Sequence, residues 1–142
     1  MEYSNRPLRA VVCQAMPEIR TDCPSPSILI VEDEILVAMN LCMAFEDDGM
    51  QIVGPARTLS EALNFLASET WIDAAVLDVD LSGHEVFPVA DQLQTQGVPF
   101  IFHTGHETQL NLNLKYPSAE VFSKPSSPDQ LVQRIQSLLD RM

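Results

Sequence analysis

Five polar residues each follow a short apolar run, and their types suit the chemistry of a divalent cation and a phosphoryl group. They are the acid pair Glu32 and Asp33, the carboxylate Asp78, the hydroxyl Thr104 and the ammonium Lys124. Taken singly, each has an ordinary structural explanation, such as a helix cap, a turn or a solvated lysine. If the apolar runs are parallel strands of one sheet, however, the side chains meet beyond the carboxyl ends of the strands.

Three carboxylates in one crevice repel one another, and one must take up a proton unless a cation lies among them. Mg²⁺ is a hard cation that uses one or two carboxylates together with water and phosphate oxygens. A carboxylate beside Mg²⁺ can attack a phosphoryl group and form an acyl phosphate. Lys124 and Thr104 would then hold the other phosphoryl oxygens, as a point charge and as a hydroxyl donor.

The apolar runs alternate with helical patterns from Ile28 onward, which predicts a parallel α/β sheet covered by helices on both faces. A capping box, Thr58-x-x-Glu61, opens one helix, and Ser127 with Pro128 opens the last one. The segment 105–118 has no clean helical pattern, so its helix is predicted to be short or irregular. The expected strands cover residues 28–31, 51–54, 74–77, 98–102 and 120–123.

Charge and cysteine content narrow the functional classes. The net charge of −12 lies entirely on residues 28–142, which carry 17 acids against 5 bases, so direct binding to nucleic acid or anionic lipid is not expected. The three cysteines have no CxxC or zinc spacing, which favours a cytoplasmic protein. No apolar run is long enough to cross a membrane. Residues 1–27 are predicted to be a disordered N-terminal leader, and residues 28–142 a single domain.

Four motifs resemble the receiver domain of two-component response regulators. They are ILIVEDE (28–34), LDVDLSG (77–83), FHTGH (102–106) and FSKP (122–125), and they occur in the family's order. The resemblance covers residues 28 to about 140, essentially the whole globular part. It implies a flavodoxin-like, doubly wound, five-stranded parallel sheet with strand order 2-1-3-4-5 and helices on both faces. Because the chain ends after the last predicted helix, we expect a stand-alone receiver without an output domain.

The resemblance also implies a role for each polar residue and a cis peptide bond between Lys124 and Pro125. It implies a phosphoacceptor that promotes its own phosphorylation and dephosphorylation rather than an enzyme with turnover. The implied donor is a sensor histidine kinase, and a downstream protein or a homodimer remains open as a further partner. By motif, Glu32 and Asp33 match the family's metal-binding acid pair, and Asp78 matches the phosphoacceptor, which is also a metal ligand. Asp80 matches the position whose main-chain carbonyl binds the metal. Thr104 matches the switch hydroxyl, and Lys124 matches the lysine that contacts the phosphoryl group.

Val121 departs from the family's pattern, and His106 could add a function to the site. The switch aromatic three residues before the lysine is replaced by Val121, and strand alternation points the adjacent Phe122 to the other face of the sheet. His106, two residues beyond Thr104, is expected near Asp80 at the mouth of the site, where a protonated imidazole would slow hydrolysis of the phosphoryl group. A solvent-exposed His106 without a role is the simpler alternative.

Two other interpretations remain open. Asp78-Val79-Asp80 also resembles the nucleophile motif of phosphatases of the haloacid dehalogenase type, but that family has the motif at its first strand. Only 64 residues follow Asp78, and Glu32 and Asp33 would then have no role. The second alternative is a receiver-like module that binds proteins without being phosphorylated, against which the intact set of polar residues argues.

Overall fold

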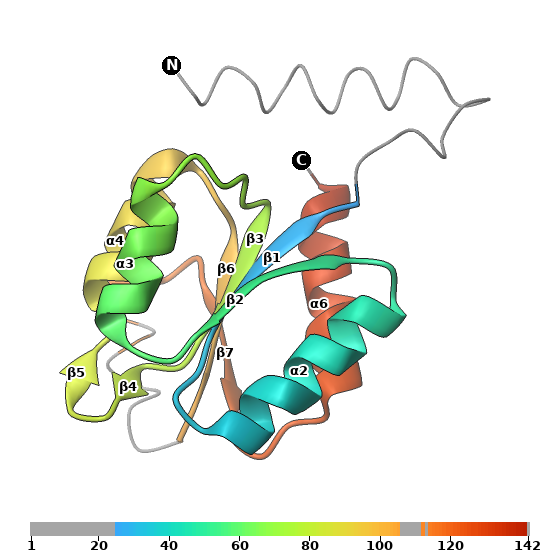
Figure 1. The fold of residues 1–142 in the computed structure, drawn as a ribbon, viewed down its shortest axis with the longest axis horizontal. Coiled ribbons are helices and arrows are strands. Elements are labelled where there is room, and N and C mark those ends of the chain that lie inside the picture. Colours follow the sequence, from blue (N-terminus) through green and yellow to red (C-terminus); the bar gives the residue numbers. More distant parts are fainter. Residues whose placement is uncertain (1–24, 106–111, 113, 142) are drawn as a thin grey trace.

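The computed structural model describes residues 25–105, 112 and 114–141, and these form one layered α/β domain (Figure 1). Its central sheet has five parallel strands in the order β2-β1-β3-β6-β7. Counting only the strands of this sheet, the order is the expected 2-1-3-4-5. The strands are β1 (Ser27–Val31), β2 (Gln51–Ala56), β3 (Ala74–Leu77), β6 (Phe100–Thr104) and β7 (Glu120–Ser123).

Helices cover both faces of the sheet, as the alternating pattern predicted. α2 (Ile35–Asp47) and α6 (Pro128–Asp140) lie on one face, and α3 (Leu59–Ala67) and α4 (Phe87–Gln96) lie on the other (Figure 1). β1 and β3 are fully buried, so their continuous apolar runs contribute alternate side chains to the two faces. A separate apolar core therefore forms under each pair of helices.

Local signals in the sequence fix several helix ends. Thr58 accepts a hydrogen bond from the Glu61 N–H at 3.1 Å and so caps α3, and the Glu61 carboxylate accepts from the Arg57 N–H at 2.8 Å. Ser127 caps α6 by accepting from the Asp129 N–H at 3.2 Å. Gly97 ends α4 in the left-handed conformation, with a φ of 75°. The predicted caps at Thr58 and Ser127 are thus confirmed.

A small hairpin after β3 was not predicted. It pairs β4 (Asp80–Leu81) with β5 (His84–Glu85) in antiparallel fashion. Ser82 and Gly83 both have positive φ, 55° and 93°, as a tight two-residue turn requires. The Asp80 carboxylate accepts from the Gly83 N–H at 2.9 Å, which stabilises the turn.

Some sequence predictions are confirmed and others lie outside the described residues. The Lys124–Pro125 bond is cis, as expected, and so is Gly54–Pro55. In the segment 105–118, residues 112, 114 and 115 are helical. The leader up to residue 24 and His106 with its expected gate are not among the described residues. In the part of the chain that is described, none of the helices has the length and apolarity of a membrane span.

Candidate functional site

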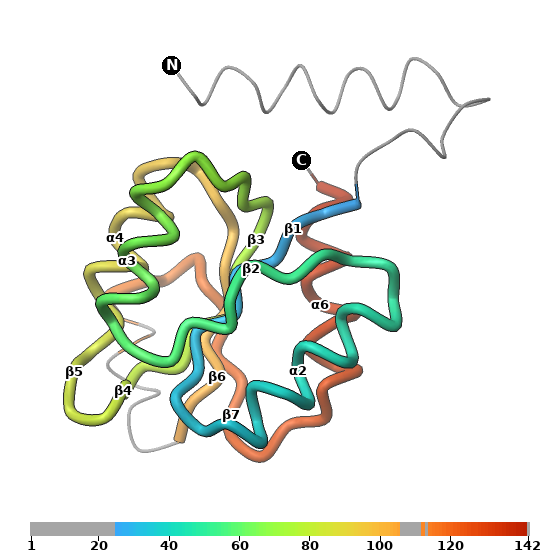
Figure 2. The backbone as a smooth tube through the Cα atoms, viewed as in Figure 1, coloured from blue at the N-terminus to red at the C-terminus, as the bar shows by residue number. Residues whose placement is uncertain are grey.

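The carboxyl ends of the strands lie at one edge of the sheet, where the backbone turns into the following loops (Figure 2). β1 pairs with β3 in parallel, and Val31 lies opposite Leu77. The next residues, Glu32 and Asp78, therefore lie side by side on neighbouring strands. Two backbone hydrogen bonds extend the sheet beyond its last paired residues: the Asp78 N–H donates to Val31 O and the Glu32 N–H donates to Ala56 O, both at 2.9 Å.

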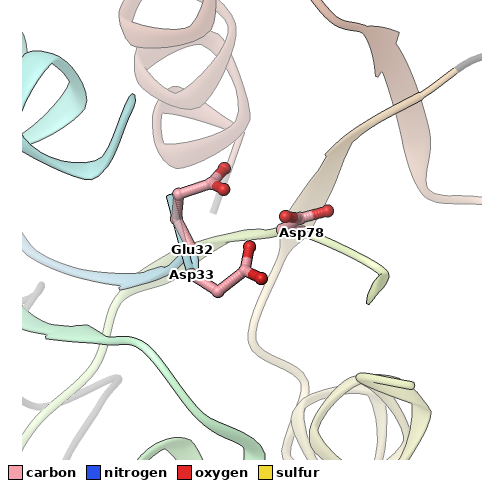
Figure 3. Close-up of side chains that lie close together, drawn as sticks. All are labelled: Glu32, Asp33 and Asp78. Atoms are coloured by element: carbon pink, nitrogen blue, oxygen red, sulfur yellow. The ribbon is translucent and has the colours of Figure 1, made fainter. Parts of the chain in front are cut away.

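Three of the expected residues form one carboxylate cluster. Glu32, Asp33 and Asp78 each offer an oxygen, and these oxygens lie within 4.8 Å of one another (Figure 3). Glu32 is 1% exposed and Asp78 is 5% exposed, whereas Asp33 is half-buried. An oxygen-only cluster that is partly open to solvent suits a hard divalent cation such as Mg²⁺. The donor set therefore fits the metal that the sequence predicts.

Lys124 enters the cluster from the end of β7. Its Nζ lies 3.0 Å from Glu32 Oε2 and 3.1 Å from Asp78 Oδ2. The Lys124 N–H donates to Thr104 O at 2.8 Å, so the end of β7 is fixed to the end of β6. The structure thus brings the predicted ammonium into direct contact with the predicted nucleophile, although 46 residues separate them.

Thr104 and Asp80 lie beside this cluster rather than within it. Thr104 is the last residue of β6 and is buried. It lies on the strand next to β3, whose end carries Asp78. The Asp80 carboxylate is engaged in the β4–β5 turn and is not part of the three-residue cluster. A role of Asp80 as a metal ligand would therefore use its main-chain carbonyl, as the resemblance implied.

Burial and charge crowding shift the protonation of the site. Burial and the neighbouring Asp78 raise the pKa of Glu32 to about 8, and burial also raises the pKa of Asp78. Burial lowers the pKa of Lys124, but its ion pairs with Glu32 and Asp78 outweigh this and raise it above its ordinary value. Burial and crowding of the carboxylates thus favour the protonated form of Glu32, whereas the Lys124 ammonium favours its charged form.

Two residues of the site were missed in the sequence. The Glu34 carboxylate lies 3.1 Å from Lys124 Nζ, and the Ser82 hydroxyl donates to Asp33 Oδ2 at 3.0 Å. Glu34 directly follows the acid pair, which is the only signal that could have indicated it. Ser82 owes its position to the unpredicted hairpin turn, so no sequence pattern indicated its contact.

His103 lies in β6 next to Thr104, is buried, and is 3% exposed. Neither ring nitrogen has a hydrogen-bond partner among the described residues. Burial and the positive charge of Lys124 lower the pKa of His103 to about 4. The imidazole is therefore neutral at physiological pH.

The structure confirms that Val121, at the switch aromatic position, and the adjacent Phe122 point to opposite faces of the sheet. Val121 packs into the core beneath α3 and α4, whereas Phe122 packs into the core beneath α2 and α6. Tyr116 is a fully buried aromatic residue on the α4 side, with its ring centroid 5.4 Å from that of Phe102. On this face the ring of Tyr116 thus packs against the rings of β6, whereas β7 contributes Val121.

The family model for the response regulator receiver domain matches residues 28–136. Among curated proteins, aerobic respiration control protein ArcA of Escherichia coli K12 is 30% identical over 120 residues, which are 82% of this chain and 50% of ArcA. The phyllosphere-induced regulator PhyR of Methylorubrum extorquens is 34% identical over 124 residues, which are 85% of this chain and 46% of PhyR. The chain thus spans about half the length of these relatives.

A solved structure agrees with the sequence comparisons. The solution structure of SdrG from Sphingomonas melonis Fr1 is 35% identical, with a TM-score of 0.69 over 81% of this chain and 97% of SdrG. The fold, the strand order and the family match therefore lead to the same conclusion. The chain belongs to the family of response regulator receiver domains.

Proposed function

We propose that this chain is a phosphorylation-dependent switch or phosphate relay in two-component signalling, with Asp78 as its phosphoacceptor. The observation that carries the proposal is the contact between Asp78 and Lys124 inside the carboxylate cluster, with Nζ 3.1 Å from Asp78 Oδ2. A nucleophile, a cation-binding set and a phosphate-binding ammonium in one cluster suit phosphoryl transfer.

In the proposed reaction, a carboxylate oxygen of Asp78 attacks the phosphorus of a phosphohistidine on a sensor histidine kinase. A new P–O bond forms, and the P–N bond to the donor imidazole breaks with its electron pair going to nitrogen. Lys124 pairs with one phosphoryl oxygen, and Thr104 donates its hydroxyl to another. Mg²⁺, held by Glu32, Asp33, Asp78 and the Asp80 main-chain carbonyl, would neutralise the charge that builds up on the oxygens.

The raised pKa values support a role for a cation in this reaction. A protonated Glu32 or Asp78 is a poorer metal ligand, and a protonated Asp78 is a poorer nucleophile. A divalent cation favours the charged forms of both. Bound Mg²⁺ would therefore also favour the charged form of Asp78, which is the better nucleophile. The net charge of −12 supports signalling to a downstream protein or a second copy of the chain rather than to nucleic acid.

The test is incubation with acetyl phosphate and Mg²⁺, followed by mass measurement of the intact protein. We expect one phosphoryl group per chain for the wild type and for Glu85→Gln, which removes an exposed acid on the nearby hairpin. Asp78→Asn is expected to take up none. Equal uptake by Asp78→Asn would contradict the proposal, and repeated turnover of a phosphomonoester would favour the haloacid dehalogenase alternative.

A further inference from the structure

Glu34 is an exposed carboxylate at the entrance of the site, and its side chain reaches Lys124 rather than the end of its own helix. It occupies the position before α2 from which a side chain can cap the helix, yet it makes no such hydrogen bond. Its Oε1 lies 3.1 Å from Lys124 Nζ. Its N–H donates to Glu32 Oε2 at 3.2 Å, which fixes the loop that carries it.

Lys124 is already saturated with acceptors. An ammonium group has three N–H donors and no acceptor. Glu32, Glu34 and Asp78 each offer Lys124 one carboxylate oxygen, at 3.0, 3.1 and 3.1 Å. A phosphoryl oxygen can therefore contact this ammonium only if one of the three carboxylates is released.

Exposure decides which carboxylate is released most easily. The side chains of Glu32 and Asp78 are 1% and 6% exposed, whereas that of Glu34 is 62% exposed. A buried carboxylate that loses its ion pair has no water to replace it, which is costly. An exposed carboxylate returns to water, and exposed ion pairs contribute little to stability. The ion pair between Glu34 and Lys124 is therefore the one that is broken most easily.

From these contacts we infer that Glu34 is a positioning residue that occupies one donor of Lys124 in the resting state and gives it up to a phosphoryl oxygen. This inference rests on the proposed phosphorylation of Asp78. Glu34 competes with the phosphoryl group for the same N–H donor, so it lowers the affinity of the site for that group. Its side chain thereby sets how readily Lys124 is available for phosphoryl binding.

Two variants separate the contact from the charge. Glu34→Asp keeps the charge but shortens the side chain, which withdraws the carboxylate from Nζ, and Glu34→Gln keeps the length but removes the charge. Glu85→Gln is the control, because it removes an exposed acid that is not an ion-pair partner of Lys124 in the described structure. The probe is beryllofluoride with Mg²⁺, which imitates a phosphoryl group on Asp78.

We expect both Glu34 variants to bind beryllofluoride about two- to fivefold more tightly than the wild type, the range set by the loss of an exposed ion pair. Glu85→Gln is expected to bind as the wild type does. Tighter binding by Glu34→Gln alone would assign the effect to charge and overturn the inference, as would unchanged or weaker binding by both variants.

A second readout observes Lys124 directly. The chain has two lysines, Lys115 and Lys124, so ¹³C-labelled lysine gives two ε-methylene signals. In the free protein, Glu34→Asp should move the Lys124 signal but not that of Lys115, and with beryllofluoride bound the variant and wild-type signals should coincide. An unmoved Lys124 signal in the free protein would overturn the inference while leaving the proposed function intact. Failure of the wild type to bind beryllofluoride would overturn both.

Discussion

The hydroxyl of Tyr116 donates a hydrogen bond of 2.6 Å to Asp91 Oδ1, which connects the residues preceding β7 to α4. The ring of Tyr116 is 1% exposed and lies within 6.1 Å, between centroids, of the rings of Phe87, Phe100 and Phe102. Phe102 is two residues before Thr104 on the same strand. Tyr116 therefore lies between α4 and the strand that carries the proposed switch hydroxyl.

Replacing Tyr116 by phenylalanine should lower the free energy of unfolding by about 1 kcal/mol, because the ring stays in place while one hydrogen bond is lost. Replacing it by alanine should cost about 3–5 kcal/mol, since the buried ring is removed as well. Urea unfolding measures both. The matched comparison is Tyr116→Phe in an Asp91→Ala background. If the hydroxyl stabilises the fold through its hydrogen bond to Asp91, Tyr116→Phe should lower the free energy of unfolding much less in the Asp91→Ala background than in the wild type. An equal decrease in both backgrounds would contradict this role of the hydrogen bond.

His103 should make stability depend on pH between about 6.5 and 4. The unfolded state takes up a proton below the ordinary histidine pKa, whereas the folded state, with its pKa lowered to about 4, does not until the pH is lower still. The contribution of His103 to the free energy of unfolding therefore has its full value above pH ~6.5 and falls by about 3 kcal/mol as the pH falls through this range. Charged groups that act on His103 are Lys124, which lowers its pKa, and Glu34, which raises it.

The measurement is the difference in unfolding free energy between wild type and His103→Leu across that pH range. The leucine variant removes the titrating group and its two ring nitrogens, which have no hydrogen-bond partner among the described residues, so its advantage over the wild type should grow as the pH falls. Because the other titrating groups are common to both proteins, their effects cancel to first order. Parallel curves for the two proteins would contradict this account of His103.

Mg²⁺ binding should release a proton below pH ~8, because the Glu32 carboxyl holds a proton when its pKa is raised. The affinity for Mg²⁺ should consequently rise as the pH rises toward that value. Calorimetric titration in two buffers of different ionisation enthalpy measures the number of protons released. In Glu32→Gln the release should be much reduced, whereas Asp33→Asn should bind more weakly but still release a proton. Equal proton release by Glu32→Gln and the wild type would count against the assignment.

Residues 1–24 should be dispensable for the stability of the domain. The Gln51 N–H donates to Pro26 O, and the Ser27 N–H donates to Asp73 Oδ2, both at 2.8 Å, so a chain that starts at Ser25 keeps these contacts. Its thermal unfolding should match that of the full chain. The control removes residues 1–27 and so deletes both contacts, and it should unfold at a lower temperature. If the chain that starts at Ser25 unfolded at a much lower temperature than the full chain, residues 1–24 would have to contribute contacts to the domain.

The sequence by itself determined the layered architecture of this protein and most of its site. Short continuous apolar runs rich in β-branched residues indicate strands buried on both faces, and their alternation with helices indicates parallel strands, whose carboxyl ends meet at one edge. That reasoning placed Glu32, Asp33, Asp78 and Lys124 together, although Lys124 is 92 residues from Glu32. The caps at Thr58 and Ser127 were also predictable, since capping depends on neighbouring residues alone.

Tertiary structure decided the contacts that depend on side-chain direction and on distant packing. Glu34 follows the acid pair in the sequence, but only the position of Lys124 shows that its carboxylate turns toward the site instead of capping α2. The pairing of Tyr116 with Asp91 joins segments 25 residues apart that share no local pattern. The raised pKa of Glu32 likewise follows from burial and from Asp78 on a neighbouring strand. Periodicity fixes which face a residue occupies, whereas its partners and its protonation depend on which groups the fold brings within hydrogen-bond distance.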